Sequence, residues 1–127
     1  MILQLPVPPS TNHLFATFKG RRIITREYKA WRENAGWEIV TQRPKAVTGP
    51  VSITLYLPFI PNRDADNFLK PALDLLVTHK LIQSDAMKCV KRLLVLIHGE
   101  SYVGVDISPD KPEIDAAKRV EAARKVA

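Results

Sequence analysis

Residues 51–78, VSITLYLPFIPNRDADNFLKPALDLLVT, join two elements that set the expected architecture. The first part alternates, with Val51, Ile53, Leu55 and Leu57 on one side and Ser52, Thr54 and Tyr56 on the other, as in a half-buried strand. Pro58 and Pro61 end this strand. A helix is predicted over about residues 68–80. Pro71 limits where this helix can begin, because proline is tolerated only in the first turn. Its expected buried stripe is Phe68, Ala72, Leu75 and Leu76.

Further elements are predicted on both sides of this unit. Residues 2–5 form a short strand, and residues 14–25 form two extended pieces around a turn at Lys19-Gly20. Thr25 caps a helix over residues 26–42, with a buried stripe of Tyr28, Trp31, Ala35 and Ile39. We expect both tryptophans, Trp31 and Trp37, in the core. Residues 89–97 and 102–107 read as two strands that pair antiparallel. The order predicts an α+β fold, with helices packed on a small mixed or antiparallel sheet.

The composition is that of one globular domain, with 127 residues, 46% of them apolar and 25% charged. The single cysteine, Cys89, excludes an internal disulfide and is expected to be a small buried apolar residue. We expect a domain over residues 1–108 and a helical extension over residues 109–127, whose apolar stripe of Ile114, Ala117 and Val120 is thin. No signal peptide or 18-residue apolar stretch is visible, so a cytoplasmic location is expected.

The charge is positive and unevenly spread, with a net charge of +6. Glu27 alone opposes a basic stretch between residues 19 and 32, which consists of Lys19, Arg21, Arg22, Arg26, Lys29 and Arg32. One interpretation is a solvated helix face with a hairpin tip. The other is a surface that contacts the phosphates of a polyanion, since Lys and Arg bind nucleic acids by displacing counterions.

Three carboxylates surround one lysine in the segment that follows the residue 51–58 strand. Two carboxylates about 4 Å apart repel by about 4 kcal/mol at an effective dielectric constant of about 20, so Asp64, Asp66 and Asp74 need a neutralising partner. In an extended segment Asp64 and Asp66 would face the same side. Asp66, Lys70 and Asp74 would line one helix face. Oxygen ligands of this kind suit Mg²⁺ or Mn²⁺.

A purely structural interpretation of the same residues stays open. Asp64 would then be a turn residue, Asp66 a helix cap, and Lys70–Asp74 a surface ion pair. A calcium EF-hand loop is excluded, because Leu69 occupies the position that requires glycine. The aspartate-nucleophile phosphatases carry threonine two residues after D-x-D, where this chain has Phe68.

The motifs DADNFLK, ALD and HKLIQSDAMK, together with PVPPSTN and GRRIIT…YKAWRENA, resemble the RusA family of Holliday-junction resolvases over about residues 2–108. The resemblance implies three catalytic, metal-binding carboxylates at Asp64, Asp66 and Asp85, an essential lysine at Lys70 and a supporting carboxylate at Asp74. This chain has Ser84-Asp85 where the family often has two aspartates. It retains one basic residue, Arg63, before the first aspartate. Arg63 is predicted to bind DNA together with the basic residues between positions 19 and 32.

The expected function is therefore that of an Mg²⁺- or Mn²⁺-dependent endodeoxyribonuclease that resolves four-way DNA junctions in recombination and repair. Lys70 is assigned to stabilising charge on the scissile phosphate, because its ordinary pKa of about 10.4 is too high for a general base. A junction with near two-fold symmetry, cut by two matched nicks, predicts a homodimer. The alternative is a non-catalytic nucleic-acid-binding protein with structural aspartates.

Overall fold

The structure is a computed structural model that describes residues 2–10, 13–111, 120–121 and 123–124 of the chain. Its elements begin with β1 (Leu3–Leu5), the hairpin strands β2 (Phe15–Phe18) and β3 (Arg21–Ile24), and helix α1 (Arg26–Gln42). Then follow β4 (Val51–Pro58), a short 3-10 helix η2 (Ala65–Phe68), helix α2 (Leu69–Thr78), β5 (Val90–His98) and β6 (Val103–Pro109). The predicted α+β class is confirmed.

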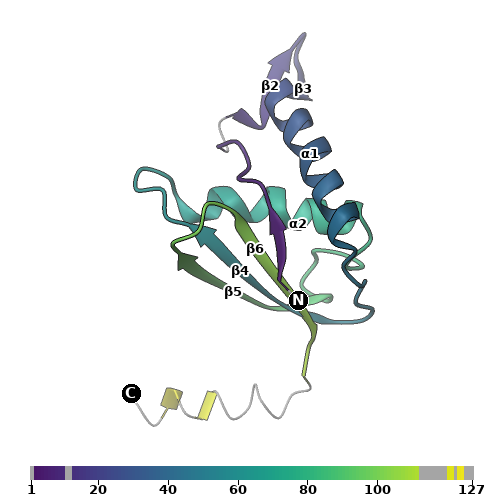
Figure 1. Ribbon diagram of the computed structural model, residues 1–127, viewed down its shortest axis with the longest axis vertical. Coiled ribbons are helices and arrows are strands. Elements are labelled where there is room, and N and C mark those ends of the chain that lie inside the picture. Colours follow the sequence, from purple (N-terminus) through teal and green to yellow (C-terminus); the bar gives the residue numbers. More distant parts are fainter. Residues whose placement is uncertain (1, 11–12, 112–119, 122, 125–127) are drawn as a thin grey trace.

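The main sheet is mixed and has the strand order β1-β6-β4-β5. β4 pairs parallel with β5 and antiparallel with β6, while β1 pairs antiparallel with β6. Figure 1 shows α2 running across this sheet and the β2–β3 hairpin at the far end of α1. The core gathers Ile53, Leu55 and Leu57 of β4 with Leu75 and Leu76 of α2. The site segments therefore extend from the most buried strand of the sheet.

The prediction that residues 89–97 and 102–107 pair with each other was wrong. β6 lies between β1 and β4, and β5 is the edge strand beyond β4. Gly104 allows this close packing in the centre of the sheet. A Cβ atom added there would lie 3.1 Å from Cγ2 of Ile2 and 3.2 Å from Cβ of Tyr56. Strands that are adjacent in sequence often pair, but here burial of Val103 and Val105 favours the central position for β6.

Helix α1 follows its prediction closely. The Thr25 hydroxyl accepts a hydrogen bond of 3.2 Å from the Tyr28 amide and caps the helix. Tyr28, Trp31, Ala35 and Ile39 are all buried, and Trp31 donates from Nε1 to the Pro6 carbonyl at 2.9 Å. The core placement of Trp37 was wrong, because its side chain is 72% exposed. At 3.6 residues per turn, Trp37 lies about 200° around the helix from Ile39 and faces solvent.

The helix predicted over about residues 68–80 is α2, and a short 3-10 helix that was not predicted, η2, precedes it and includes Asp66. Pro71 lies in the first turn of α2 as expected, and the stripe of Phe68, Ala72, Leu75 and Leu76 is buried. Cys89 is also buried, as predicted. Within the described part of the chain, no helix is both long and apolar enough to cross a membrane.

The predicted helix over residues 109–127 falls mostly outside the described residues, including Ile114 and Ala117. Before it, Asp110 is fixed to the start of β4. Its amide donates to the Pro50 carbonyl at 2.9 Å, and its Oδ1 accepts a 2.7 Å hydrogen bond from the Ser52 hydroxyl. Arg92 on β5 lies 3.9 Å from the same oxygen. These contacts anchor the residue that follows β6 to the sheet.

Candidate active site

The turn after β4 presents two aspartates to solvent. Asp64 has extended backbone angles (φ −72°, ψ 140°) and occupies the N-cap position of η2, but its side chain makes no capping hydrogen bond. Its carbonyl accepts a 3.1 Å hydrogen bond from the Asn67 amide. Asp66 lies within η2, so the extended geometry expected for residues 64–66 was wrong. Both side chains are exposed, and Asp66 lies inside η2, so it is not the helix cap that the structural interpretation expects.

Arg63 connects this turn to the proline-rich loop near the N-terminus. Its Nη2 donates to the carbonyl oxygens of Pro8, at 2.6 Å, and Pro9, at 2.7 Å. The guanidinium also lies 4.3 Å from the centre of the Phe68 ring. Burial lowers the pKa of Arg63 from its usual value. Its Nε is buried and has no partner among the described residues. Arg63 therefore holds the loop that leads into Asp64 against a second segment.

Lys70 and Asp74 form the ion pair that their four-residue spacing predicts. Lys70 Nζ lies 3.3 Å from Asp74 Oδ2 on the surface of α2. The two side chains are 62% and 37% exposed, so water screens the pair and its net contribution to stability is small. The lysine head remains accessible to a ligand at the helix surface.

Asp85 joins Lys70 and Asp74 at a shallow cavity of about 340 Å³. The turn that carries Asp85 is stabilised by a 3.0 Å hydrogen bond from the Ala86 amide to the Ser84 hydroxyl. Helix α1 contributes Tyr28 and Arg32 to the opposite wall. The structure thus brings Arg32 of α1 to the two carboxylates and the lysine of α2 and the turn after it. Asp64 and Asp66 do not line this cavity.

Tyr28 is a lining residue that the sequence interpretation assigned to the core alone. Its burial, and next the negative charge of Asp74, raise the pKa of the phenol, while Arg32 acts in the opposite direction. A signal for this role was present in the sequence, since a buried tyrosine usually directs its hydroxyl to a polar or wet site. The negative charge of Asp74 therefore disfavours ionisation of the Tyr28 phenol.

The predicted metal ligands Asp64, Asp66 and Asp85 are not gathered in one place. Within residues 2–10 and 13–111 and the short described C-terminal pieces, no three His, Cys, Asp or Glu side chains form a group that could hold a metal ion. The exposed pair Asp64 and Asp66 still has the donor chemistry for Mg²⁺, which proteins usually hold by one or two carboxylates, with water and substrate phosphate completing the coordination. Asp85 lines the cavity with Lys70 and Asp74, which Asp64 and Asp66 do not line.

The six predicted DNA-binding residues between positions 19 and 32 lie on the β2–β3 hairpin and the first half of α1, while Arg63 lies in the turn after β4. Arg22 stacks over Phe15 with its guanidinium 3.8 Å from the ring centre, and Lys19 lies 5.5 Å from the centre of the Phe18 ring. Arg32 lies 5.7 Å from the ring centre of Tyr28 and borders the cavity. The basic stretch therefore runs from the hairpin tip to the edge of the Lys70–Asp85 cavity.

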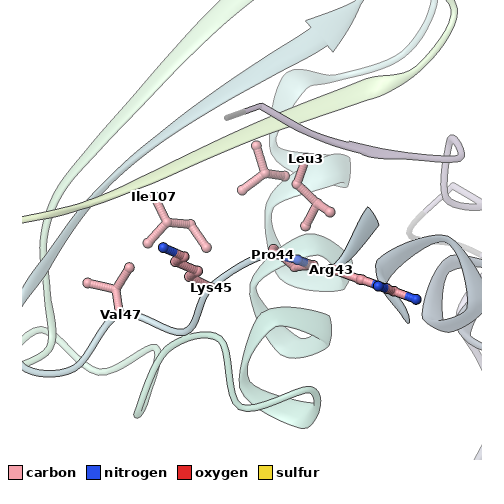
Figure 2. Close-up of a pocket in the computed structure, with 7 residues that line it drawn as sticks. Leu3, Arg43, Pro44, Lys45, Val47 and Ile107 are labelled. Atoms are coloured by element: carbon pink, nitrogen blue, oxygen red, sulfur yellow. The ribbon is translucent and has the colours of Figure 1, made fainter. Parts of the chain in front are cut away.

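A second cavity, of about 310 Å³, lies between the end of α1 and the sheet, away from these carboxylates. Figure 2 shows Leu3, Val47 and Ile107 around it, with Lys45 among them and the Arg43 side chain extending to one side. Its lining contains no carboxylate, so it offers none of the groups that the chemistry of the first cavity requires.

Exposed carboxylates at Asp64 and Asp66, and a lysine paired with Asp74 at the end of an extended basic surface, suit an enzyme that cleaves nucleic-acid phosphodiesters. The comparison with protein-family models agrees with this class. The family described as Endodeoxyribonuclease RusA matches residues 6–108. The chain belongs to the RusA endodeoxyribonuclease family, and this membership indicates nuclease activity. A search of curated proteins found no match.

Proposed function

We propose that the protein resolves four-way (Holliday) DNA junctions by paired symmetric nicks, in DNA recombination and repair. The observation that carries this proposal is the meeting of Lys70, Asp74 and Asp85 with Arg32, the last member of the basic stretch, at one cavity. A DNA backbone that follows the basic residues reaches the acidic groups at this point. Family membership supports the same reaction.

DNA binding is assigned to Lys19, Arg21, Arg22, Arg26, Lys29, Arg32 and Arg63. The first six follow the hairpin and α1, and five of them are exposed. Phosphate contacts of this kind position the DNA without reading its sequence. Arg63 adds a positive charge directly before Asp64, although its Nη2 is already engaged with Pro8 and Pro9. The basic surface would thus set the path of a strand toward the cleavage site.

Lys70 is assigned to the charge that develops on the scissile phosphate or on the leaving oxygen. Its Nζ lies 3.3 Å from Asp74 Oδ2, and this ion pair favours one position of the ammonium on the surface of α2. A charge that is positioned before the reaction stabilises the transition state without reorganisation. Asp74 then acts through Lys70 and is a positioning residue.

A divalent cation is part of the proposal, with Mg²⁺ or Mn²⁺ as the candidates. Asp64 and Asp66 would hold it through their carboxylate oxygens, and Asp85 is the third proposed ligand because the family resemblance implies it. When bound, such an ion supplies Lewis-acid chemistry, which activates water and neutralises phosphate charge. The chain itself contributes the exposed carboxylates of the turn after β4 and the ammonium of Lys70.

The experiment offers the purified protein a mobile four-way junction and a matched linear duplex, each with Mg²⁺ and with EDTA. The proposal expects symmetric nicks in the junction with Mg²⁺, no nicks with EDTA, and an intact duplex. Junction binding without nicking under every condition would contradict it. That outcome would favour a non-catalytic junction-binding protein, an alternative that the separation of Asp85 from Asp64 and Asp66 supports.

A further inference from the structure

We propose that Phe59 determines specificity for branched DNA, by stacking its ring on a base that the branch point leaves unstacked. The inference rests on the proposed function and deepens it, because it concerns how the protein distinguishes a four-way junction from linear duplex. Three features of the molecule support it: the exposure of Phe59, the hollow that it shares with the neighbours of Asp64, and the closed turn between these two residues.

Phe59 belongs to a cluster of exposed apolar side chains at the carboxyl end of β4. It is 71% exposed, Ile60 beside it is 37% exposed, and Ile97 near the end of β5 is 56% exposed. All three line one hollow of about 170 Å³. Single exposed apolar residues are common on a protein surface, but a cluster of them often marks an interaction site. This cluster therefore suits a ligand that offers an apolar surface.

The hollow borders the aspartate turn. Arg63 and Ala65, the two sequence neighbours of Asp64, both line it. Its volume is below the roughly 300–1,000 Å³ of pockets that enclose a small ligand, so it suits one flat ring that lies against the surface. Each nucleotide carries one phosphate and one base. A strand whose phosphate lies at Asp64 would therefore bring a base to the ring of Phe59.

The backbone between Phe59 and Asp64 is held by a closed turn. The Arg63 amide donates a 3.1 Å hydrogen bond to the Ile60 carbonyl. Pro61 occupies the second position of this turn, where the fixed φ of proline is favoured. A side chain on such a restrained backbone loses less conformational entropy when it binds. The turn thus sets the ring of Phe59 at a defined place relative to Asp64.

A contact with a base supplies the selectivity that the basic residues do not. The stretch between residues 19 and 32 is suited to phosphates, which a junction and a duplex share. An aromatic ring stacks on any base, because every base has a π-face. In a continuous duplex a base must first leave its stack, at a cost in free energy. At a branch point the stack is already interrupted, so stacking on Phe59 favours the junction.

The test measures binding to a four-way junction and to a matched duplex in EDTA, with 2-aminopurine at the branch point to report on base stacking. Phe59→Ala should weaken junction binding by about fivefold or more and abolish the change in 2-aminopurine fluorescence. Duplex binding should be unchanged. Since stacking releases no counterions, the salt dependence of junction binding should also be unchanged.

Two further variants complete the experiment. Phe59→Leu keeps an apolar side chain but has no ring, so it should lose the preference for the junction as Phe59→Ala does. Trp37→Ala is the matched control, because Trp37 is a similarly exposed aromatic residue, at 72%, on α1. This control should bind the junction and change the 2-aminopurine signal as the wild type does.

Three results would overturn the proposal. One is wild-type junction binding by Phe59→Ala and Phe59→Leu, and another is equal weakening of junction and duplex binding. The third is a lower molar mass of Phe59→Ala in sedimentation, which would assign the cluster to contact between copies of the chain. The measurements contain no cleavage step, so a protein that binds the junction but never nicks it would contradict the proposed function and still show the role of Phe59.

Discussion

Arg63 donates a 2.6 Å hydrogen bond to the carbonyl oxygen of Pro8 and so ties the residue before the first aspartate to a loop 55 positions earlier in the sequence. Pro9 accepts a second hydrogen bond from the same Nη2 atom. Prolines have no amide hydrogen but keep their carbonyl acceptors, which suits them for contact with a guanidinium. The PVPPS segment thereby becomes part of the support for the aspartate turn.

Arg63→Ala is predicted to lower the free energy of unfolding by about 2–3 kcal/mol, because it removes two charge-assisted hydrogen bonds and the contact with Phe68. Arg63→Lys should recover only part of this loss, since an ammonium cannot reproduce the planar guanidinium. Chemical denaturation measures both variants. Arg21→Ala, at an exposed position, is the control and should change stability by about 0.5 kcal/mol or less. Equal stabilities for Arg63→Ala and the wild type would show that the contacts with Pro8 and Pro9 are dispensable.

Substitution of Arg21 and Arg22 by Ala should weaken junction binding and flatten its salt dependence. The slope of the logarithm of the binding constant against the logarithm of the salt concentration should become less negative, by up to about 0.9 for each phosphate that the two arginines no longer neutralise. Binding isotherms at several salt concentrations measure this change. Lys45→Ala, at the second cavity, is the control. An unchanged affinity and slope in the double variant would make the basic stretch a solvated face.

Lys70→Ala should lower the single-turnover cleavage rate by about a hundredfold or more and leave junction affinity nearly unchanged, as expected for a group that acts in the transition state. Removal of the exposed ion pair with Asp74 should cost only about 0.5 kcal/mol of stability. Quench-flow cleavage and equilibrium binding on the same preparation separate the two effects. Full activity in a folded Lys70→Ala variant would reduce Lys70 to a surface ion pair of α2.

The raised pKa of Tyr28 predicts a loss of stability at alkaline pH. The phenol ionises more readily in the unfolded chain, near 10.0, than in the folded protein. Its stabilising contribution is therefore complete below pH 10.0 and declines as the pH rises from there through the folded-state value. Tyr28→Phe should flatten this decline in thermal melts.

The charge of Asp74 contributes to the same shift, so Asp74→Asn should lower the Tyr28 pKa toward its ordinary value. Ultraviolet titration follows tyrosinate absorbance. The difference between Asp74→Asn and the same protein that also carries Tyr28→Phe gives the titration of Tyr28 alone. Asp106→Asn on β6, outside the cavity, is the matched control. An identical Tyr28 titration in Asp74→Asn and the wild type would remove the electrostatic link between α1 and α2.

Local sequence signals predicted the elements better than their pairing. The Thr25 cap and the stripe from Tyr28 to Ile39 indicated the bounds of α1, and the alternation from Val51 to Leu57 indicated β4. Strand order depends on tertiary packing, so the short distance in sequence between β5 and β6 was misleading. The packing of Ile2 and Tyr56 over Gly104, which helps to explain the central place of β6, involves three segments that no local pattern connects.

The candidate site likewise has features that local sequence predicts and features that depend on tertiary packing. The Lys70–Asp74 ion pair follows from helical spacing alone and was predictable. The approach of Asp85 to this pair depends on how the turn after α2 returns along the helix, and the place of Tyr28 and Arg32 depends on how α1 packs. The 3-10 helix at Ala65–Phe68 was missed because four residues give no usable periodicity, and it changed the geometry expected for Asp66.

Junction nicking by Asp66→Asn tests whether the aspartate turn after β4 is catalytic. Asn keeps the size of the side chain and removes its charge. Asp66 sits within η2, whose N-cap position is taken by Asp64, so no capping hydrogen bond is at stake. With Mg²⁺ and a mobile four-way junction, the variant should bind as tightly as the wild type or more tightly, remain as stable in thermal melts, and produce no nicks. Wild-type nicking by a folded Asp66→Asn variant would show that this turn is not catalytic.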